Sequence, residues 1–142
     1  MDVRFLVDRL KERITLRDVA EIGGAADLDA ARRGTLRPRS IYVVPLSDRP
    51  RQRGNDQLGC AGGRIELYAV LLVVDQVRDA TGGEALAELP ALRRAVAGAL
   101  RGWQPDQHHD PVEFMGGQLV QFTGDGHLWW SDEYGCVNHG PI

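Results

Sequence analysis

The chain has 142 residues, of which 43% are hydrophobic and 26% charged, the proportions of an ordinary soluble globular protein. Its longest apolar run, residues 68–74, is far shorter than the ~18 residues of a membrane helix, and its N-terminus resembles neither a signal nor a transit peptide. Two cysteines, Cys60 and Cys136, are too few for a disulfide framework or a zinc site. We therefore expect one domain over residues 1–142, folded in a cytoplasm, with free thiols and no membrane association.

The net charge of -3 is unevenly distributed along the chain. The segment from Arg32 to Arg64 contains eight arginines and two acids, a charge of +6, so the remaining residues carry -9. This asymmetry predicts an electropositive surface at one end of the molecule.

The first half of the chain alternates helical and extended patterns. Apolar residues recur at helical spacing over residues 3–14, and Asp2 is placed to cap that helix. Pro45 marks the end, or an edge position, of a β-branched apolar strand. The predicted elements are, in chain order, a helix over 3–14, a strand over 18–22, a helix of at most two turns over 27–33 and a strand over 40–46.

Residues 47–63 contain four glycines and one proline and show no periodicity, which predicts a long, flexible, glycine- and arginine-rich loop. Its arginines, with two that precede the strand before it, would form a mobile cationic arm for an acidic protein surface or for nucleic acid. These residues are Arg37, Arg39, Arg49, Arg51 and Arg53. The loop has no aromatic side chain to stack on bases, and a merely solvated loop is the remaining interpretation.

The second half contains the longest strand pattern and the longest helix. Pro90 interrupts the helix, which we expect to be kinked or in two parts. The segments before the last hairpin are either two strands or one strand bent at Gly116 and Gly117, and Asp125 with Gly126 is typical of a hairpin turn. The predicted elements are a strand over 64–77, a helix over 82–100, strands over 112–117, 118–124 and 127–134, and a C-terminal tail over 135–142. This order predicts an α+β domain, a mainly antiparallel sheet with two main helices packed on it.

No motif of catalysis or cofactor binding is present. The sequence has no phosphate-binding loop, no dinucleotide fingerprint and no nucleophile elbow, so we predict no catalytic residue, no cofactor and no enzyme activity. The best metal candidate is the cluster of His108, His109 and Asp110, with Glu113 and His127 as further ligands. Its spacing does not match the usual ligand intervals, which favours a solvated polar loop and no metal.

Two adjacent tryptophans, Trp129 and Trp130, lie in the last predicted strand. Because neighbouring side chains of a strand point to opposite faces, one indole should enter the core while the other leaves it. Leu128 and Trp130 form the more apolar set, which leaves Trp129 beside polar neighbours. A loop holding Trp103 could seal Trp129, or another subunit could, and the enrichment of tryptophan in binding hot spots favours the subunit.

Four segments, in their order and spacing, resemble the tail terminator-like proteins of long-tailed bacteriophages. They read YVVPLSDR (42–49), LRGWQPD (100–106), FMGGQLVQF (114–122) and LWWSDEY (128–134). The likeness spans about residues 3–134 and implies the α+β fold of a tail terminator.

The resemblance implies a structural virion protein without catalysis. Such proteins form a six-membered ring that caps the head-proximal end of the tail tube, stops tube elongation and then joins the filled head. The implied partners are further copies of the chain, the major tail tube protein and a head–tail connector protein, with DNA only passing through the lumen. The implied location is the neck-proximal end of the tail in the virion, after assembly in the host bacterial cytoplasm.

The resemblance also divides roles among the candidate residues. The arginines of the cationic arm would contact the tube or the lumen, Trp129 and Trp130 would pack between subunits, and Gly102, Trp103 and Pro105 would hold the turn before the last strands. Another neck or head-completion connector is the first alternative. A small metal-dependent enzyme or a nucleic-acid-binding protein, using the histidine loop or the arginines, is the second.

Overall fold

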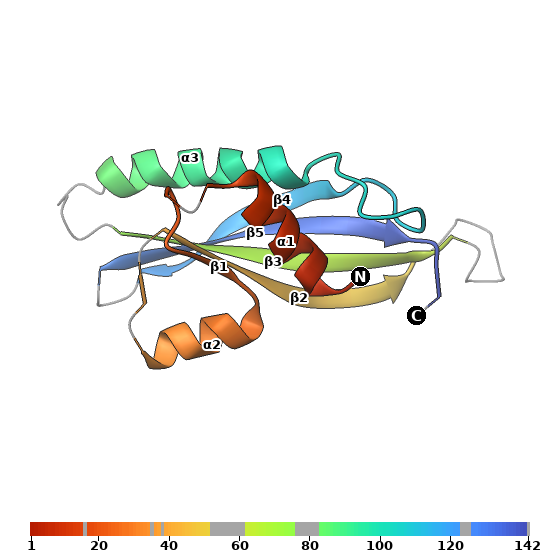
Figure 1. Ribbon diagram of the computed structural model, residues 1–142, viewed down its shortest axis with the longest axis horizontal. Coiled ribbons are helices and arrows are strands. Elements are labelled where there is room, and N and C mark those ends of the chain that lie inside the picture. Colours follow the sequence, from red (N-terminus) through yellow and green to blue (C-terminus); the bar gives the residue numbers. More distant parts are fainter. Residues whose placement is uncertain are drawn as a thin grey trace.

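The computed structural model describes residues 1–15, 17–34, 36–37, 39–51, 62–75, 83–122 and 126–141. Within these ranges the chain forms one five-stranded sheet and three helices (Figure 1). The elements are, in chain order, α1 (Val3–Arg13), β1 (Glu21–Gly23), α2 (Ala25–Arg33), β2 (Ser40–Pro50), β3 (Arg64–Asp75), α3 (Gly83–Leu100), β4 (Glu113–Phe122) and β5 (His127–Asn138). None of these helices is long and apolar enough to cross a membrane. The predicted α+β class is confirmed.

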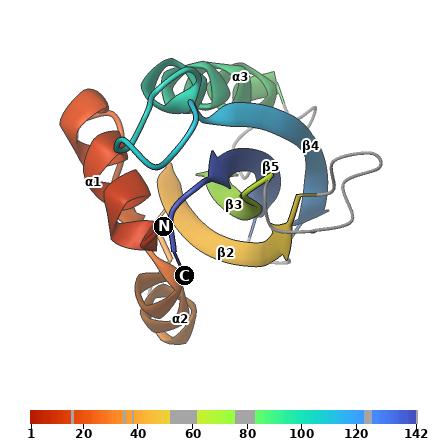
Figure 2. The ribbon, with the colours of Figure 1, turned by 90° about the vertical axis from the view of Figure 1, so that its right-hand side faces the viewer.

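The sheet has the strand order β1-β2-β3-β5-β4, so β1 and β4 form its edges. β1 runs parallel to β2, whereas the other three strand pairs are antiparallel. The parallel pair exists because α2 connects β1 to β2 as a crossover, and it makes the sheet mixed rather than purely antiparallel. Viewed end-on, the sheet is strongly curved, with β2 and β4 arching around β3 and β5 (Figure 2).

The helices cover the two faces of the sheet unequally. α1 and α3 pack on one face over the main hydrophobic cluster, to which they contribute residues such as Leu10 and Val96. α2 lies on the opposite face (Figure 1) and covers a smaller cluster of Tyr42, Val73 and Trp129. The two core clusters therefore use alternate residues of the same strands, as the two-residue period of a strand requires.

The register of β5 explains the adjacent tryptophans. Trp129 and Trp130 face opposite sides of the sheet, as predicted, and Trp130 packs against the main cluster while staying partly exposed. Trp129 is only 3% exposed. Leu28 of α2 packs against its cluster, and the guanidinium of Arg32 lies 5.2 Å from the centroid of its ring. α2 thus seals Trp129, where we expected a loop or another subunit, and almost no surface of this indole remains for a partner.

β2 is longer than predicted. It continues through Pro45 to Pro50 and stays paired with β3 after a register shift between Pro45 and Ser47. β1 pairs only with residues 40–42 of β2. Beyond that point no other described strand pairs with this edge of β2, and a residue without an N–H is tolerated there. The N–H of Arg51 then donates to the carbonyl of Gly63 at 2.9 Å. Residues 47–51 therefore continue the ladder and are not loop, while residues 52–61 of the expected loop lie outside the described residues.

Other boundaries differ in smaller ways. β1 is confined to three residues, α3 passes through Pro90 as one helix, and β5 runs to Asn138, so residues 135–138 are strand and not tail. β4 is a single strand, with Gly116 at φ +127° beside a register shift between Phe114 and Gly116. The predicted turn at 123–125 and the end of the long strand at 76–77 lie outside the described residues.

We predict that Trp129→Ala lowers the free energy of unfolding by about 3 kcal/mol or more, because it leaves a cavity between α2 and the sheet. Urea denaturation followed by circular dichroism measures this change. Leu119→Ala is the control, because Leu119 is 45% exposed and its truncation should cost at most ~0.5 kcal/mol. An unchanged midpoint for Trp129→Ala would show that α2 does not bury this indole.

Candidate functional site

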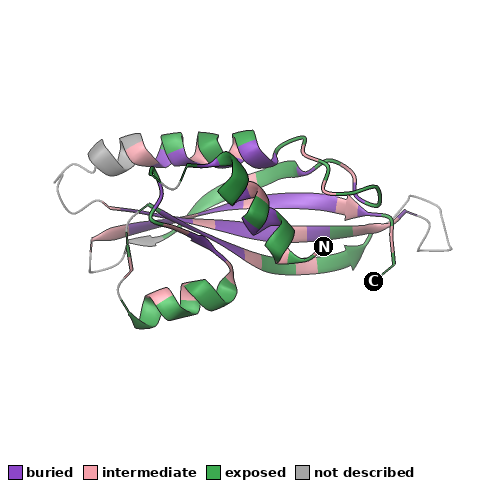
Figure 3. Cartoon of the chain, in the orientation of Figure 1, coloured by how far each residue is buried: buried purple, intermediate pink, exposed green. Residues whose placement is uncertain are grey.

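Within the described ranges, one part of the sheet has no helix over it. α2 covers only one end of its face, and most residues in the far half of β2 are exposed (Figure 3). Arg49 pairs directly with Ile65, so both side chains project from the same face. Arg51, Ile65 and Met115 line a shared hollow of about 270 Å³, and Ile65 is 37% and Met115 51% exposed. We call Arg49, Arg51, Ile65 and Met115 the open sheet face. It has two apolar side chains beside two arginines, and Asp110 and Glu113 also line the hollow.

The predicted cationic arm is not one unit. Arg37 and Arg39 precede β2 and are ion-paired, Arg37 with Glu21 at 3.5 Å and Arg39 with Glu88 at 4.0 Å. Arg49 lies ten residues after Arg39, which along a strand corresponds to about 33 Å. The two groups of arginines therefore sit at opposite ends of β2, and Arg53 lies outside the described residues.

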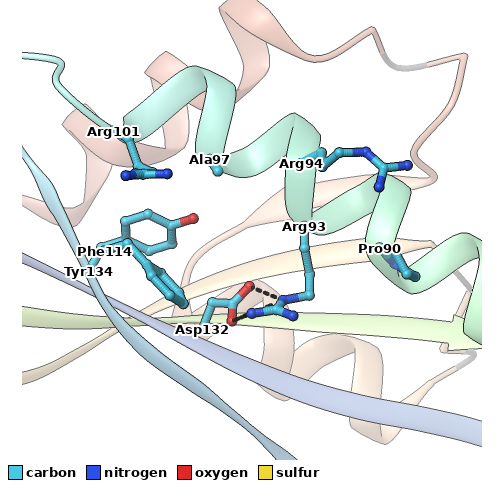
Figure 4. A pocket seen from close by; sticks show the side chains of 8 residues that line it. All are labelled: Pro90, Arg93, Arg94, Ala97, Arg101, Phe114, Asp132 and Tyr134. Atoms are coloured by element: carbon cyan, nitrogen blue, oxygen red, sulfur yellow. Dashed lines mark hydrogen bonds and ion pairs between the residues drawn. The ribbon is translucent and has the colours of Figure 1, made fainter.

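A second concave surface lies between α3 and the edge of the sheet (Figure 4). Arg93 extends from α3 to Asp132 on β5, where its Nε lies 2.9 Å from one carboxylate oxygen and its Nη2 lies 3.0 Å from the other. The indole N–H of Trp130 donates to the same carboxylate at 2.8 Å. Asp132 is only 1% exposed, and a Cβ on Gly117 would collide with it. This pair of a half-buried guanidinium and a buried carboxylate ties α3 to β5, and Gly117 leaves the room that the carboxylate needs.

Other residues of this surface, among them Arg94, Arg101 and Phe114, are exposed. We call it the α3/β4 groove, and it is lined by Pro90, Arg93, Arg94, Ala97, Arg101, Phe114, Asp132 and Tyr134. Arg94 and Arg101 are exposed, and no carboxylate of the described residues lies within ion-pair distance of either. The ring of Phe114 is 39% exposed and packs edge-on against Tyr134, with 5.6 Å between centroids. Burial raises the pKa of the Tyr134 phenol to about 12, so this phenol is uncharged at neutral pH.

The groove adjoins the exposed edge strand β4. Among the described strands none pairs with its outer edge, and apolar side chains project from both of its faces. These are Phe114, Met115, Leu119 and Val120, which are 39–51% exposed. An exposed apolar edge strand is a template for pairing with another chain, so this edge is a candidate assembly surface.

The turn before β4 is fixed by its backbone. Gly102 has φ +76°, its N–H donates to Val112 at 2.8 Å, and the Val112 N–H donates to Trp103 at 2.9 Å. Trp103 packs against the main core, with Arg9 of α1 5.4 Å from its ring centroid. Pro105 follows as a half-buried residue of the same loop. Gly102 and Trp103 therefore set the point from which β4 begins.

The histidine loop is not simply solvated. His109 is 5% exposed, and its Nε2 lies 2.9 Å from Glu66 while its Nδ1 lies 2.7 Å from Asp106. Glu66, also buried, is paired with the α-amino group of Met1. Within the described ranges no three His, Cys, Asp or Glu side chains are grouped as metal ligands. His109 thus fastens the loop to β3. The feature of the sequence that could have indicated this contact is Glu66, an isolated glutamate within the most apolar strand.

A family model described as phage tail terminator protein matches residues 1–139. The chain belongs to the phage tail terminator family. This tail terminator is therefore a structural protein of the phage virion, from a family that is not one of enzymes and that associates with other tail and head components. No curated protein matches the chain.

In this tail terminator, Arg93→Met should lower the free energy of unfolding by about 2 kcal/mol, because it keeps the apolar stem but removes the two N–H donors that Arg93 gives to a buried carboxylate. Arg94→Met, one residue later and exposed, should change it by less than ~0.5 kcal/mol. Guanidinium denaturation of both variants measures the difference. Equal stability of the two variants would contradict a structural role for the Arg93–Asp132 pair.

We also predict a loss of stability in acid that depends on Glu66. Burial opposes ionisation of its carboxyl, but the α-amino group and His109 outweigh burial and hold its pKa below the ordinary value of 4.5. A depressed folded pKa contributes stability that is present above pH 4.5 and disappears as the pH falls through the folded pKa.

Glu66→Gln should therefore be less stable than wild type at pH 7, and its melting temperature should fall less steeply from pH 5 to pH 3. Thermal melts across this range measure the slope. The exposed Glu113→Gln should keep the wild-type slope, and a wild-type slope in Glu66→Gln would rule out the proposed linkage.

Proposed function

We propose that this tail terminator forms a closed homohexameric ring that caps the head-proximal end of the tail tube, stops tube elongation and presents the surface that joins the head. The observation that carries the proposal is the family match over residues 1–139. The exposed apolar edge of β4 supports it, because such an edge invites pairing with another chain. In this arrangement DNA passes through the lumen of the ring, at the neck of the virion.

The open sheet face is the proposed contact with the tube protein. Its apolar side chains, Ile65 and Met115, would be covered, while Arg49 and Arg51 at its margin would meet acidic groups of the tube. Arg53 follows closely in the sequence and adds to the same basic segment. Arg37 and Arg39 are held in ion pairs at the other end of β2 and are better suited to the lumen or to a structural role.

The ring and the capping activity can be measured separately. Static light scattering should give the mass of six chains of 15.7 kDa, about 94 kDa, over a concentration series. Added to polymerising tube protein of the same phage, the ring should arrest growth and give shorter tubes in electron micrographs. Tubes of unchanged length in the presence of the ring would contradict capping.

Arg49→Ala combined with Arg51→Ala should leave the ring mass unchanged but raise the concentration needed for arrest at least ~10-fold, because it removes the charges that meet the tube. Arg17→Ala combined with Arg33→Ala is the matched control, since both arginines are exposed and lie elsewhere. Equal loss of arrest in both double variants would mean that total charge, and not the open sheet face, governs tube binding.

A further inference from the structure

α1 carries an exposed stripe on the side opposite the one it buries. At about 100° per residue, Phe5, Asp8 and Glu12 fall within about 60° of one another on the helix. They point away from Leu6 and Leu10, which are fully buried against the core. All three residues of the stripe are exposed, and Phe5 is 51% exposed. We call Phe5, Asp8 and Glu12 the α1 stripe.

The α1 stripe is unfavourable as a free surface. Asp8 and Glu12 stand four residues apart, a spacing at which like charges on a helix repel. Glu12 also lies in the last turn, where the helix dipole favours cations. Arg4 lies four residues before Asp8 and attracts it, but in the part of the chain that the structure describes neither carboxylate lies within ion-pair distance of a cation. A partner that is cationic and offers an apolar site for Phe5 would relieve all of these costs.

The α3/β4 groove has the complementary chemistry. Arg93 is already occupied by Asp132, which leaves Arg94 and Arg101 as two cations without partners among the described residues. Figure 4 shows Arg101 above the rings of Phe114 and Tyr134, which form an apolar wall. Two free cations and an aromatic wall thus match two free carboxylates and one exposed aromatic ring.

The dimensions of the two surfaces are compatible. Asp8 and Glu12 stand four residues apart on α1, about 6 Å along its axis, whereas Arg94 on α3 and Arg101 just after its end stand seven residues apart, about 10.5 Å. Ala97 lies between the two arginines on the groove side, and its small side chain lets another helix approach closely. The long arginine side chains can then reach Asp8 and Glu12 while Phe5 contacts Phe114.

The two surfaces lie on different sides of the molecule. Seen end-on, α1 is at one side of the curved sheet and β4 at the other (Figure 2). A chain cannot join these two surfaces within itself, but successive copies can join them in series. Contacts between unlike patches generate rings when the rotation between copies closes.

We infer that the α1 stripe of one copy docks into the α3/β4 groove of the next, and that this head-to-tail contact closes the ring. The inference rests on the proposed function, in which copies of this chain form a ring. It assigns Asp8 and Glu12 as partners of Arg94 and Arg101, and it places Phe5 beside the exposed edge of Phe114. The apolar edge of β4 is then covered at the margin of the same contact.

Charge reversal on each side tests the pairing. Asp8→Arg with Glu12→Arg, and separately Arg94→Glu with Arg101→Glu, should each raise the concentration for half-assembly at least ~100-fold, because like charges then face each other. Light scattering should give the mass of one chain for each variant, with melting temperatures close to wild type. Asp18→Arg with Asp29→Arg changes the net charge as much as the first variant and should assemble normally.

Mixing separates lost complementarity from lost folding. An equimolar mixture of the two variants should recover the wild-type mass. The reversed stripe of the first variant then meets the reversed groove of the second, and the unreversed stripe of the second meets the unreversed groove of the first, so alternating copies close a ring of even number. The chain with all four reversals should assemble alone for the same reason. A mixture that stays monomeric would overturn the pairing.

Two further outcomes distinguish this inference from the proposed function. A stripe variant that keeps the wild-type mass but no longer arrests tube growth would place the α1 stripe against the tube, and would overturn the pairing while leaving the ring intact. Wild-type protein that never exceeds the mass of one chain, in solution or on tube ends, would overturn the ring itself and the pairing with it.

Discussion

The pairing of β3 with β5 along their whole length is the constraint on which the rest of the structure depends. Twelve residues of each strand are joined in one register, which assigns every side chain of both strands to a face. Trp130 goes to the face under α1 and α3, and Val73 and Trp129 go to the face under α2. A shift by one residue would exchange the two sets and expose the main core. Because β2 and β4 add to this pair, the open sheet face and the α3/β4 groove are also placed by it.

Features that depend on one element could be predicted from the sequence. The helical spacing of apolar residues predicted α1, and the side chain of Asp2 accepts a hydrogen bond from the Arg4 N–H at the start of this helix, as expected. The alternation of side chains along a strand predicted the opposite orientations of Trp129 and Trp130. The extent of β2 could not be predicted, because Pro45 and residues 47–50 are ordered by pairing with β3. Local composition carries no information about a partner strand that lies beyond a long connection.

The contacts that define the candidate sites were hidden for the same reason. Arg93 and Asp132 are 39 residues apart, and Glu66 and His109 are 43 residues apart. The number of arginines in the sequence likewise did not show which of them form ion pairs within the fold. Arg93 holds a buried carboxylate, whereas its neighbour Arg94 faces solvent. The charged side chains available for assembly are therefore those that are not already paired within the chain. Only a structure distinguishes these from the charges that are paired internally.

The position of Trp129 beneath α2 has an optical consequence. α2 contributes no fully buried residue of its own, yet it supplies the cover of Trp129, while Trp103 and Trp130 pack on the opposite face of the sheet. Any event that lifts α2 would move one indole from an apolar site into water and leave the other two where they are. The emission of Trp129 would shift to longer wavelength, so the protein carries an intrinsic fluorescent reporter for changes on the face that includes its proposed tube contact.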